Sequence, residues 1–279
     1  MNLSLSGTVV ATHQDGTDLD PLWSPRPFLH PVTTLAGTTV TELAPADHRH
    51  HLGFGVALPD VSGTSFWGGR TFTREHGSVL LDNHGRQRHL RTLAQGPDHH
   101  TALLSWTDPR ERELIVEERA LRALPLDHRT WVLDVRITLR NTSDQDLSIG
   151  SPATNGRPGA GYGGLFWRAP LGPRPPAVTG PDGLRGEQVL HGASVPWLSL
   201  AGTTDQDAPW TLLLHQLAPD PDPWFLRAAQ YPGTGPALAW DRRRPLPRQA
   251  TLRRRLRIAI ADGHQDDHPA LADAVAALT

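Results

Sequence analysis

Three histidines and an aspartate lie within five residues, and this cluster is the strongest candidate in the chain for a site that does chemistry. Its members are Asp47, His48, His50 and His51. Imidazoles titrate near neutral pH, so they can act as general acids, as general bases or as hydrogen-bond donors to sugar hydroxyls. If the segment is a loop, all three rings can converge. If it lies on a strand, His48 and His50 face one side and His51 the other.

The same spacing allows two other interpretations. Two histidines two residues apart on a strand are a known pair of metal ligands, so His48 and His50 are also candidates for a divalent metal site, with Asp47 orienting one ring from behind. The remaining interpretation is a polar loop with exposed histidines and no function.

Two further segments carry aromatic side chains beside glycines. Trp67 precedes Gly68 and Gly69, where an indole can lie flat at a cleft floor and stack on a sugar ring. A tryptophan buried in the core is the alternative. His89 is a third candidate for proton transfer, although an isolated histidine is usually structural.

A glycine-rich segment, residues 154–167, formally contains G-x-G-x-x-G. A dinucleotide site needs a helix directly after this motif, and here the chain runs into Pro170 instead, so we expect no nucleotide cofactor. A close-packed loop that presents Asn155, Arg157 and Tyr162 fits better. The arginine can donate two parallel hydrogen bonds to a carboxylate or to vicinal hydroxyls.

The composition excludes several kinds of chemistry. The chain has no cysteine, and all 27 of its basic residues are arginine, so thiol nucleophiles, thiolate metal sites and Schiff-base lysines are absent. The formal net charge of -2 gives no basic surface for nucleic acid. With no signal peptide pattern and no apolar run of membrane-spanning length, we expect a cytoplasmic protein whose partners are small molecules.

Short runs of alternating apolar residues predict an all-β fold, a large antiparallel β-sandwich formed by residues 1–279 as a single domain. Thr130 to Arg140 is the clearest strand, and 113–124 should pair with it as a hairpin. One helix should close the chain, beginning at Pro269 with Asp267 or His268 as its cap. The other expected strands are 3–5, 9–10, 28–32, 39–41, 53–58, 195–201, 210–216, 224–229 and 251–260.

Two groups of charged residues are expected to be structural. The arginine runs 242–244 and 253–255 are interpreted as solvated strand edges, where charge discourages aggregation. Glu117 and Glu118 are adjacent on a presumed strand, so only one of them can face a cleft as a carboxylate base; a surface pair is the simpler interpretation.

Taken together, several segments resemble the bacterial family catalogued as PmoA-like, or DUF6807. The resemblance covers nearly the whole chain and rests on 26–32, 47–53, 60–69, 155–167, 223–225 and 261–263. It implies a supersandwich like that of galactose mutarotases, a carbohydrate ligand, and association with a sugar oxidoreductase. The family's label, a methane oxygenase subunit, implies a metal-dependent oxygenase or a lyase.

The leading hypothesis is therefore a carbohydrate-active enzyme that uses histidine acid–base catalysis on a sugar or keto-sugar, like an isomerase, epimerase or lyase. Its alternatives are a carbohydrate-binding module without catalysis and the metal-dependent lyase or oxygenase. His48, His51 and His89 would transfer protons. The expected ligand-binding residues are His50, Trp67, Asn155, Arg157 and Tyr162.

Overall fold

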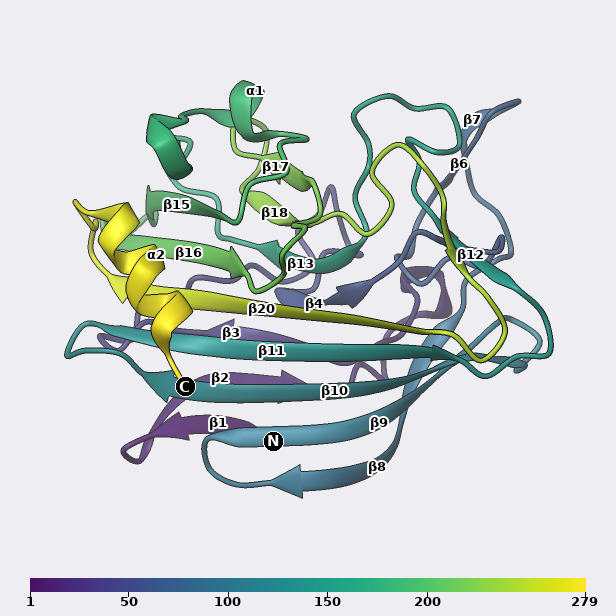
Figure 1. Ribbon diagram of the computed structural model, residues 1–279, viewed down its shortest axis with the longest axis horizontal. Helices are drawn as coiled ribbons and strands as arrows, with labels where there is room; N and C mark the ends of the chain where they lie inside the picture. Colours follow the sequence, from purple (N-terminus) through teal and green to yellow (C-terminus); the bar gives the residue numbers. More distant parts are fainter.

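Antiparallel strands are the main secondary structure of the computed structural model, which describes all 279 residues (Figure 1). Two large sheets face each other across the main hydrophobic core. The seven-stranded sheet has the order β1 (Asn2–Leu5), β2 (Thr8–Gln14), β3 (Phe28–Val32), β4 (Phe54–Ala57), β13 (Gly164–Arg168), β18 (Gly233–Pro236) and β17 (Trp224–Arg227). The eight-stranded sheet has the order β14 (Ala177–Thr179), β15 (Trp197–Thr203), β16 (Pro209–Gln216), β20 (Thr251–Asp262), β11 (Thr130–Asn141), β10 (Glu113–Pro125), β9 (His99–Thr107) and β8 (Arg86–Gln95).

Smaller elements complete the chain. A three-stranded sheet contains β19 (Arg244–Leu246), β12 (Leu147–Gly150) and β5 (Asp60–Val61), and a hairpin contains β6 (Thr71–Thr73) and β7 (Gly77–Val79). The helical segments are the 3-10 turns η1 (Pro21–Trp23) and η2 (Pro181–Gly183), the short α1 (Glu187–Leu190) and the C-terminal α2 (His268–Ala277). No helix is long and apolar enough to cross a membrane.

The predicted sandwich is confirmed, and strand β11 shows how the sequence produces it. The side chains at alternate positions, Trp131 to Leu139, are at most 1% exposed and belong to the core between the sheets. The predicted hairpin is also confirmed, because β10 and β11 pair antiparallel with Leu124 opposite Val132.

The C-terminal helix forms a third layer. Asp267 caps it, since its Oδ1 accepts a hydrogen bond from the Ala270 amide at 2.9 Å. Leu271 and Val275 pack on the outer face of the eight-stranded sheet against residues such as Leu213, and Figure 1 shows α2 lying over β16 and β20.

The expectation of solvated strand edges was wrong for the run 253–255, whereas the run 242–244 leads into β19, an edge strand of the three-stranded sheet. Strand β20 lies between β16 and β11 inside its sheet, and four of the six arginines form ion pairs. Arg244 and Arg254 both hold Asp222, which is 4% exposed. The predicted strand at 39–41 is also wrong, because only an isolated bridge from Thr39 to Thr33 forms there.

The outer face of the seven-stranded sheet carries a second, smaller apolar cluster. Along β13, Leu165 and Trp167 point into the main core, while Phe166 between them points to the opposite face. Phe225 on β17 points to this same outer face, and Trp67 packs in one cluster with the two phenylalanines. This outer cluster forms the floor on which the candidate site is built.

Candidate functional site

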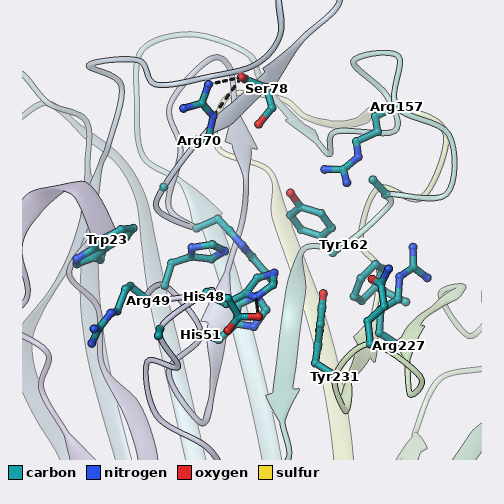
Figure 2. Close-up of a pocket in the computed structure, with 18 of the residues that line it drawn as sticks. Trp23, His48, Arg49, His51, Arg70, Ser78, Arg157, Tyr162, Arg227 and Tyr231 are labelled. Carbon is teal, nitrogen blue, oxygen red and sulfur yellow. Dashed lines mark hydrogen bonds and ion pairs between the residues drawn. The ribbon is translucent and has the colours of Figure 1, made fainter. Parts of the chain in front are cut away.

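A pocket of about 860 Å³ opens above this outer cluster (Figure 2). Its walls come from segments far apart in the sequence: the loop that carries the histidines, the β17–β18 region and the glycine-rich loop before β13. The lining residues include Trp23, 46–51, Trp67, Gly69, Arg70, Ser78, Arg157, Ala160, Tyr162, Glu187, Phe225, Arg227 and 229–231.

The histidine cluster is a loop, and its three rings converge on the pocket. The Ala44 amide donates to the His51 carbonyl at 2.7 Å, and the His51 amide donates to the His48 carbonyl at 2.9 Å, so the chain turns sharply between them. The ring centroids of His48 and His51 are 4.6 Å apart and stacked, and those of His50 and His51 are 4.8 Å apart.

A buried arginine holds the loop in place. Arg26 is 4% exposed, and its guanidinium donates to the carbonyl oxygens of Trp23 and His50 at 2.8 and 2.6 Å. It forms no ion pair, so burial lowers the pKa of Arg26 to about 9. Gly69 closes against the loop from the other side, because a Cβ there would lie 3.0 Å from His50 Nδ1.

Burial disfavours the charged form of two of the three histidines, His50 and His51. It lowers the pKa of His50 to about 3, with the charge of Arg26 acting in the same direction. Burial also lowers the pKa of His51 far below its usual range, and the buried Nδ1 of His51 has no hydrogen-bond partner. Both rings are therefore uncharged at neutral pH.

His48 is the most accessible of the three. Its side chain is 30% exposed, and its Nδ1 lies 2.9 Å from Oδ2 of Asp47, at an angle outside that of a hydrogen bond. His48 is thus the ring best placed to exchange a proton with a bound molecule.

Aromatic side chains form the centre of the pocket. Trp67 is 4% exposed and lies under Tyr162, with ring centroids 4.6 Å apart. Tyr231 lies against His48 at 4.9 Å, with the Arg168 guanidinium 4.5 Å from its ring centre. Burial raises the pKa of Tyr162 to about 12 and that of Tyr231 in the same direction. Figure 2 shows both hydroxyls pointing toward the open part of the pocket.

Tyr231, Glu187 and Arg227 are among the lining residues that were not predicted. Glu187 Oε2 accepts hydrogen bonds from the amides of Ala228 and Ala229 at 2.8 and 3.0 Å, so α1 fixes the turn that carries Tyr231. Arg227 pairs with Glu187 at 3.6 Å. One signal was present in the sequence, since the chain has only two tyrosines and both line this pocket.

Two of the predicted site residues lie outside the pocket. His89 is exposed on β8, where its Nε2 lies 3.1 Å from Thr92 Oγ1. Asn155 donates to Asp60 Oδ2 at 3.0 Å, next to Arg243, and so supports the base of the glycine-rich loop. His48, His50, His51, Trp67, Arg157 and Tyr162 all line the pocket.

The two adjacent glutamates also differ from the expected surface pair. Glu118 is exposed, whereas Glu117 is fully buried in the core between the sheets, where it pairs with Arg119 at 2.7 Å. It faces no cleft.

No group of three or more histidine, aspartate or glutamate side chains is arranged to hold a metal ion. The metal site at His48 and His50 stays a prediction, as do the single domain, the oxidoreductase partner and the cytoplasmic location.

Comparison with known proteins places the sequence in a family. The sequence model of the family described as "Family of unknown function (DUF6807)" matches residues 1–275. No curated protein matches the sequence. Among solved structures the chain is similar to a "Putative aldose 1-epimerase" from Escherichia coli K12, with 11% identity, a TM-score of 0.38, and 80% of this chain and 88% of that chain covered. It is also similar to the heparan sulfate lyase HepC of Pedobacter heparinus, with 10% identity, a TM-score of 0.30, and 67% and 23% covered.

Proposed function

The chain belongs to DUF6807, a family of unknown function, and from this premise we propose that its pocket binds a sugar or keto-sugar and moves a proton on it by histidine acid–base catalysis. The observation that carries this proposal is the convergence of His48, Tyr162 and Tyr231 on one open pocket of about 860 Å³. Pockets for small ligands span roughly 300–1,000 Å³, so a monosaccharide or disaccharide fits.

His48 is the proton-transfer group. It combines access to the pocket with a nearby carboxylate, Asp47, whose Oδ2 lies 2.9 Å from its Nδ1. His51 stacks on His48 and stays neutral, so it positions the reacting ring and cannot serve as an acid. His50 has the same neutral character and helps to shape the wall beside Trp23.

The tyrosines are the sugar contacts. Tyr162 covers Trp67, so the phenol ring, with the indole behind it, is the surface on which the apolar face of a sugar would stack. The hydroxyls of Tyr162 and Tyr231 make no hydrogen bond within the protein, which leaves both free to bond sugar oxygens. Polar groups of this kind fix the orientation of a ligand in a mostly apolar pocket.

The experiment compares His48→Asn with the wild type on a panel of aldoses and keto-sugars in deuterated water. NMR would follow anomeric interconversion and exchange of the hydrogen next to the carbonyl group. We expect His48→Asn to lower turnover about 100-fold or more, the usual contribution of a general acid or base. His128→Asn, in the exposed β10–β11 turn, is the matched control. Full turnover by His48→Asn would refute the catalytic assignment.

One observation favours a second candidate, a carbohydrate-binding module without catalysis. Catalytic groups usually have a pKa near the working pH, whereas burial lowers the pKa of His51, which the sequence predicted as a proton-transfer residue, far below its usual range. This alternative predicts saturable binding of a sugar by calorimetry and no change in its NMR spectrum over time.

A further inference from the structure

Arginines outnumber carboxylates among the side chains that line the pocket. Four arginines line it, Arg49, Arg70, Arg157 and Arg227, against two carboxylates, Asp47 and Glu187. Arg227 is paired with Glu187, and Arg70 donates twice to the carbonyl of Ser78. Figure 2 shows Arg49 pointing away from the other labelled side chains.

Arg157 is the arginine that faces the centre of the pocket. Figure 2 shows its guanidinium directed toward Tyr162 across the open space. It forms no ion pair and no side-chain hydrogen bond, although it lies close enough for its charge to oppose the rise in pKa of both tyrosines. All its donors are therefore free, and two phenol hydroxyls point into the same space.

The floor adds positive charge. Arg26 lies buried beneath His50 with only carbonyl oxygens as partners, so its charge is not cancelled by a carboxylate. The neutral rings of His50 and His51 do not offset it. A negative group in the pocket would gain from this field, because the site is partly shielded from water and charges interact more strongly there.

We propose that the natural ligand is an acidic sugar, a uronate or an aldonate, whose carboxylate is held by Arg157 and by the hydroxyls of Tyr162 and Tyr231. A guanidinium is planar and offers parallel N–H donors, a geometry that matches the two oxygens of a carboxylate. The inference rests on the proposed function, since it names the ligand class of the same pocket.

Calorimetry tests the proposal on the full-length protein with glucuronate, galacturonate and gluconate, against glucose and galactose as neutral counterparts. We expect at least one of the acids to bind about tenfold tighter or more than its neutral counterpart, a typical gain from a charge-assisted hydrogen bond. Arg157→Gln should remove this preference. Arg157→Lys should keep only part of the preference, because lysine retains the positive charge but lacks the parallel N–H donors of the guanidinium.

Arg253→Gln is the matched control, because Arg253 is exposed on β20, outside the pocket, and its loss removes one charge at a distance. If neutral and acidic sugars bind equally, the acidic ligand is refuted while the sugar site stands. If Arg157→Gln retains the preference, the inference that Arg157 holds the carboxylate is refuted. If glucose 6-phosphate binds more tightly than every carboxylate, the pocket is a phosphate site and the inference is also refuted. If no sugar binds at all, both the inference and the proposed function fail.

Discussion

At the scale of single residues, burial gives identical side chains different properties. His48 and His51 stack on each other, yet one is open to the pocket and the other is 2% exposed. Desolvation penalises a charged imidazole, so the inner ring stays neutral while the outer ring lies beside Asp47. A loop with three histidines thus contains one candidate for proton transfer and two rings that shape its surroundings.

The two tyrosine hydroxyls provide a direct test of the binding surface. We expect Tyr162→Phe and Tyr231→Phe each to weaken sugar binding by about threefold to tenfold, the loss of one hydrogen bond, measured by calorimetry. Stability to urea should change by less than about 0.5 kcal/mol, because neither hydroxyl has a protein partner that would be left unsatisfied. Undiminished sugar binding by both variants would show that the hydroxyls do not contact the ligand.

The sequence predicted much of the pocket at this scale, and the reason is chemical. Histidines, a tryptophan beside glycines, and an arginine and a tyrosine in a glycine-rich loop are unusual groupings, and those at 48–51, 67, 157 and 162 meet in one pocket. Tyr231 and Glu187 have ordinary sequence neighbours, so nothing local marks them. The low accessibility of His51 also depends on distant segments, because Phe166 on β13 and Tyr231 in the β17–β18 turn pack against it.

At the scale of elements, one glycine joins the histidine loop to the sheet. Gly53 has φ of +61°, and a Cβ there would lie 2.3 Å from the Leu29 carbonyl oxygen on β3. We expect Gly53→Ala to lower the free energy of unfolding by about 3 kcal/mol, the sum of left-handed strain and a steric clash. Urea unfolding would measure it.

Gly7→Ala is the control for that change. Gly7 also has a positive φ, +85°, but nothing lies within 4 Å of its Cβ position. It should therefore cost only about 1–2 kcal/mol, the strain alone. Equal costs for the two variants would contradict the close packing of Gly53 against β3.

A histidine pair between the sheets predicts how the protein responds to acid. His13 on β2 faces His100 on β9, with ring centroids 5.3 Å apart. Burial, followed by the charges of His100 and Arg119, lowers the pKa of His13 from 6.5 to about 4. The unfolded chain therefore takes up a proton as the pH falls through 6.5, while the folded chain does not.

Stability should consequently fall as the pH drops from about 6.5 to about 4, by up to about 1 kcal/mol per pH unit from this residue. His13→Gln should reduce that slope, measured as urea unfolding at a series of pH values. His76→Gln, whose side chain is 72% exposed, should leave the slope unchanged. An unaltered slope in His13→Gln would show that His13 is not held neutral.

Strands were predictable where one face is buried and the other is not. Strand β11 alternates clearly and was found, whereas β8 was missed because Arg88 to Gln95 are exposed on both faces of an edge strand. Strand β18, Gly-Thr-Gly-Pro, is buried throughout and was also missed. Its two glycines and its proline disfavour strands by propensity, and pairing with β13 and β17 imposes the conformation.

At the scale of the whole molecule, the two sheets contribute unequally to the site. The eight-stranded sheet supplies one wall of the core and carries α2 on its outer face. The seven-stranded sheet faces the core with one side and the pocket with the other. Periodicity in the sequence identifies the layers, but it does not say which strands become neighbours, so it cannot say which loops meet above β13 and β17.

A hydrogen-bond network around a buried ion pair on β10 also joins the two sheets and provides the last prediction. Glu117 is 0% exposed and binds Arg119 through both carboxylate oxygens at 2.7 Å. Arg119 in turn donates to the Pro27 carbonyl at 3.1 Å and to Gln87 Oε1 at 2.8 Å, while Gln87 donates to the Val56 carbonyl on β4. The network thus runs from the eight-stranded sheet to the seven-stranded sheet.

Removing one partner leaves an uncompensated charge in the core, so Glu117→Leu and Arg119→Met should each cost about 3–5 kcal/mol in urea unfolding. The double variant should cost clearly less than the sum of the two, because it leaves no buried charge and only neutral groups, such as the Trp106 N–H that donates to Glu117 Oε2, without partners. Glu118→Leu, the exposed neighbour, should change stability by less than about 0.5 kcal/mol. Strictly additive costs in the double variant would mean that the pair does not act as a unit across the sandwich.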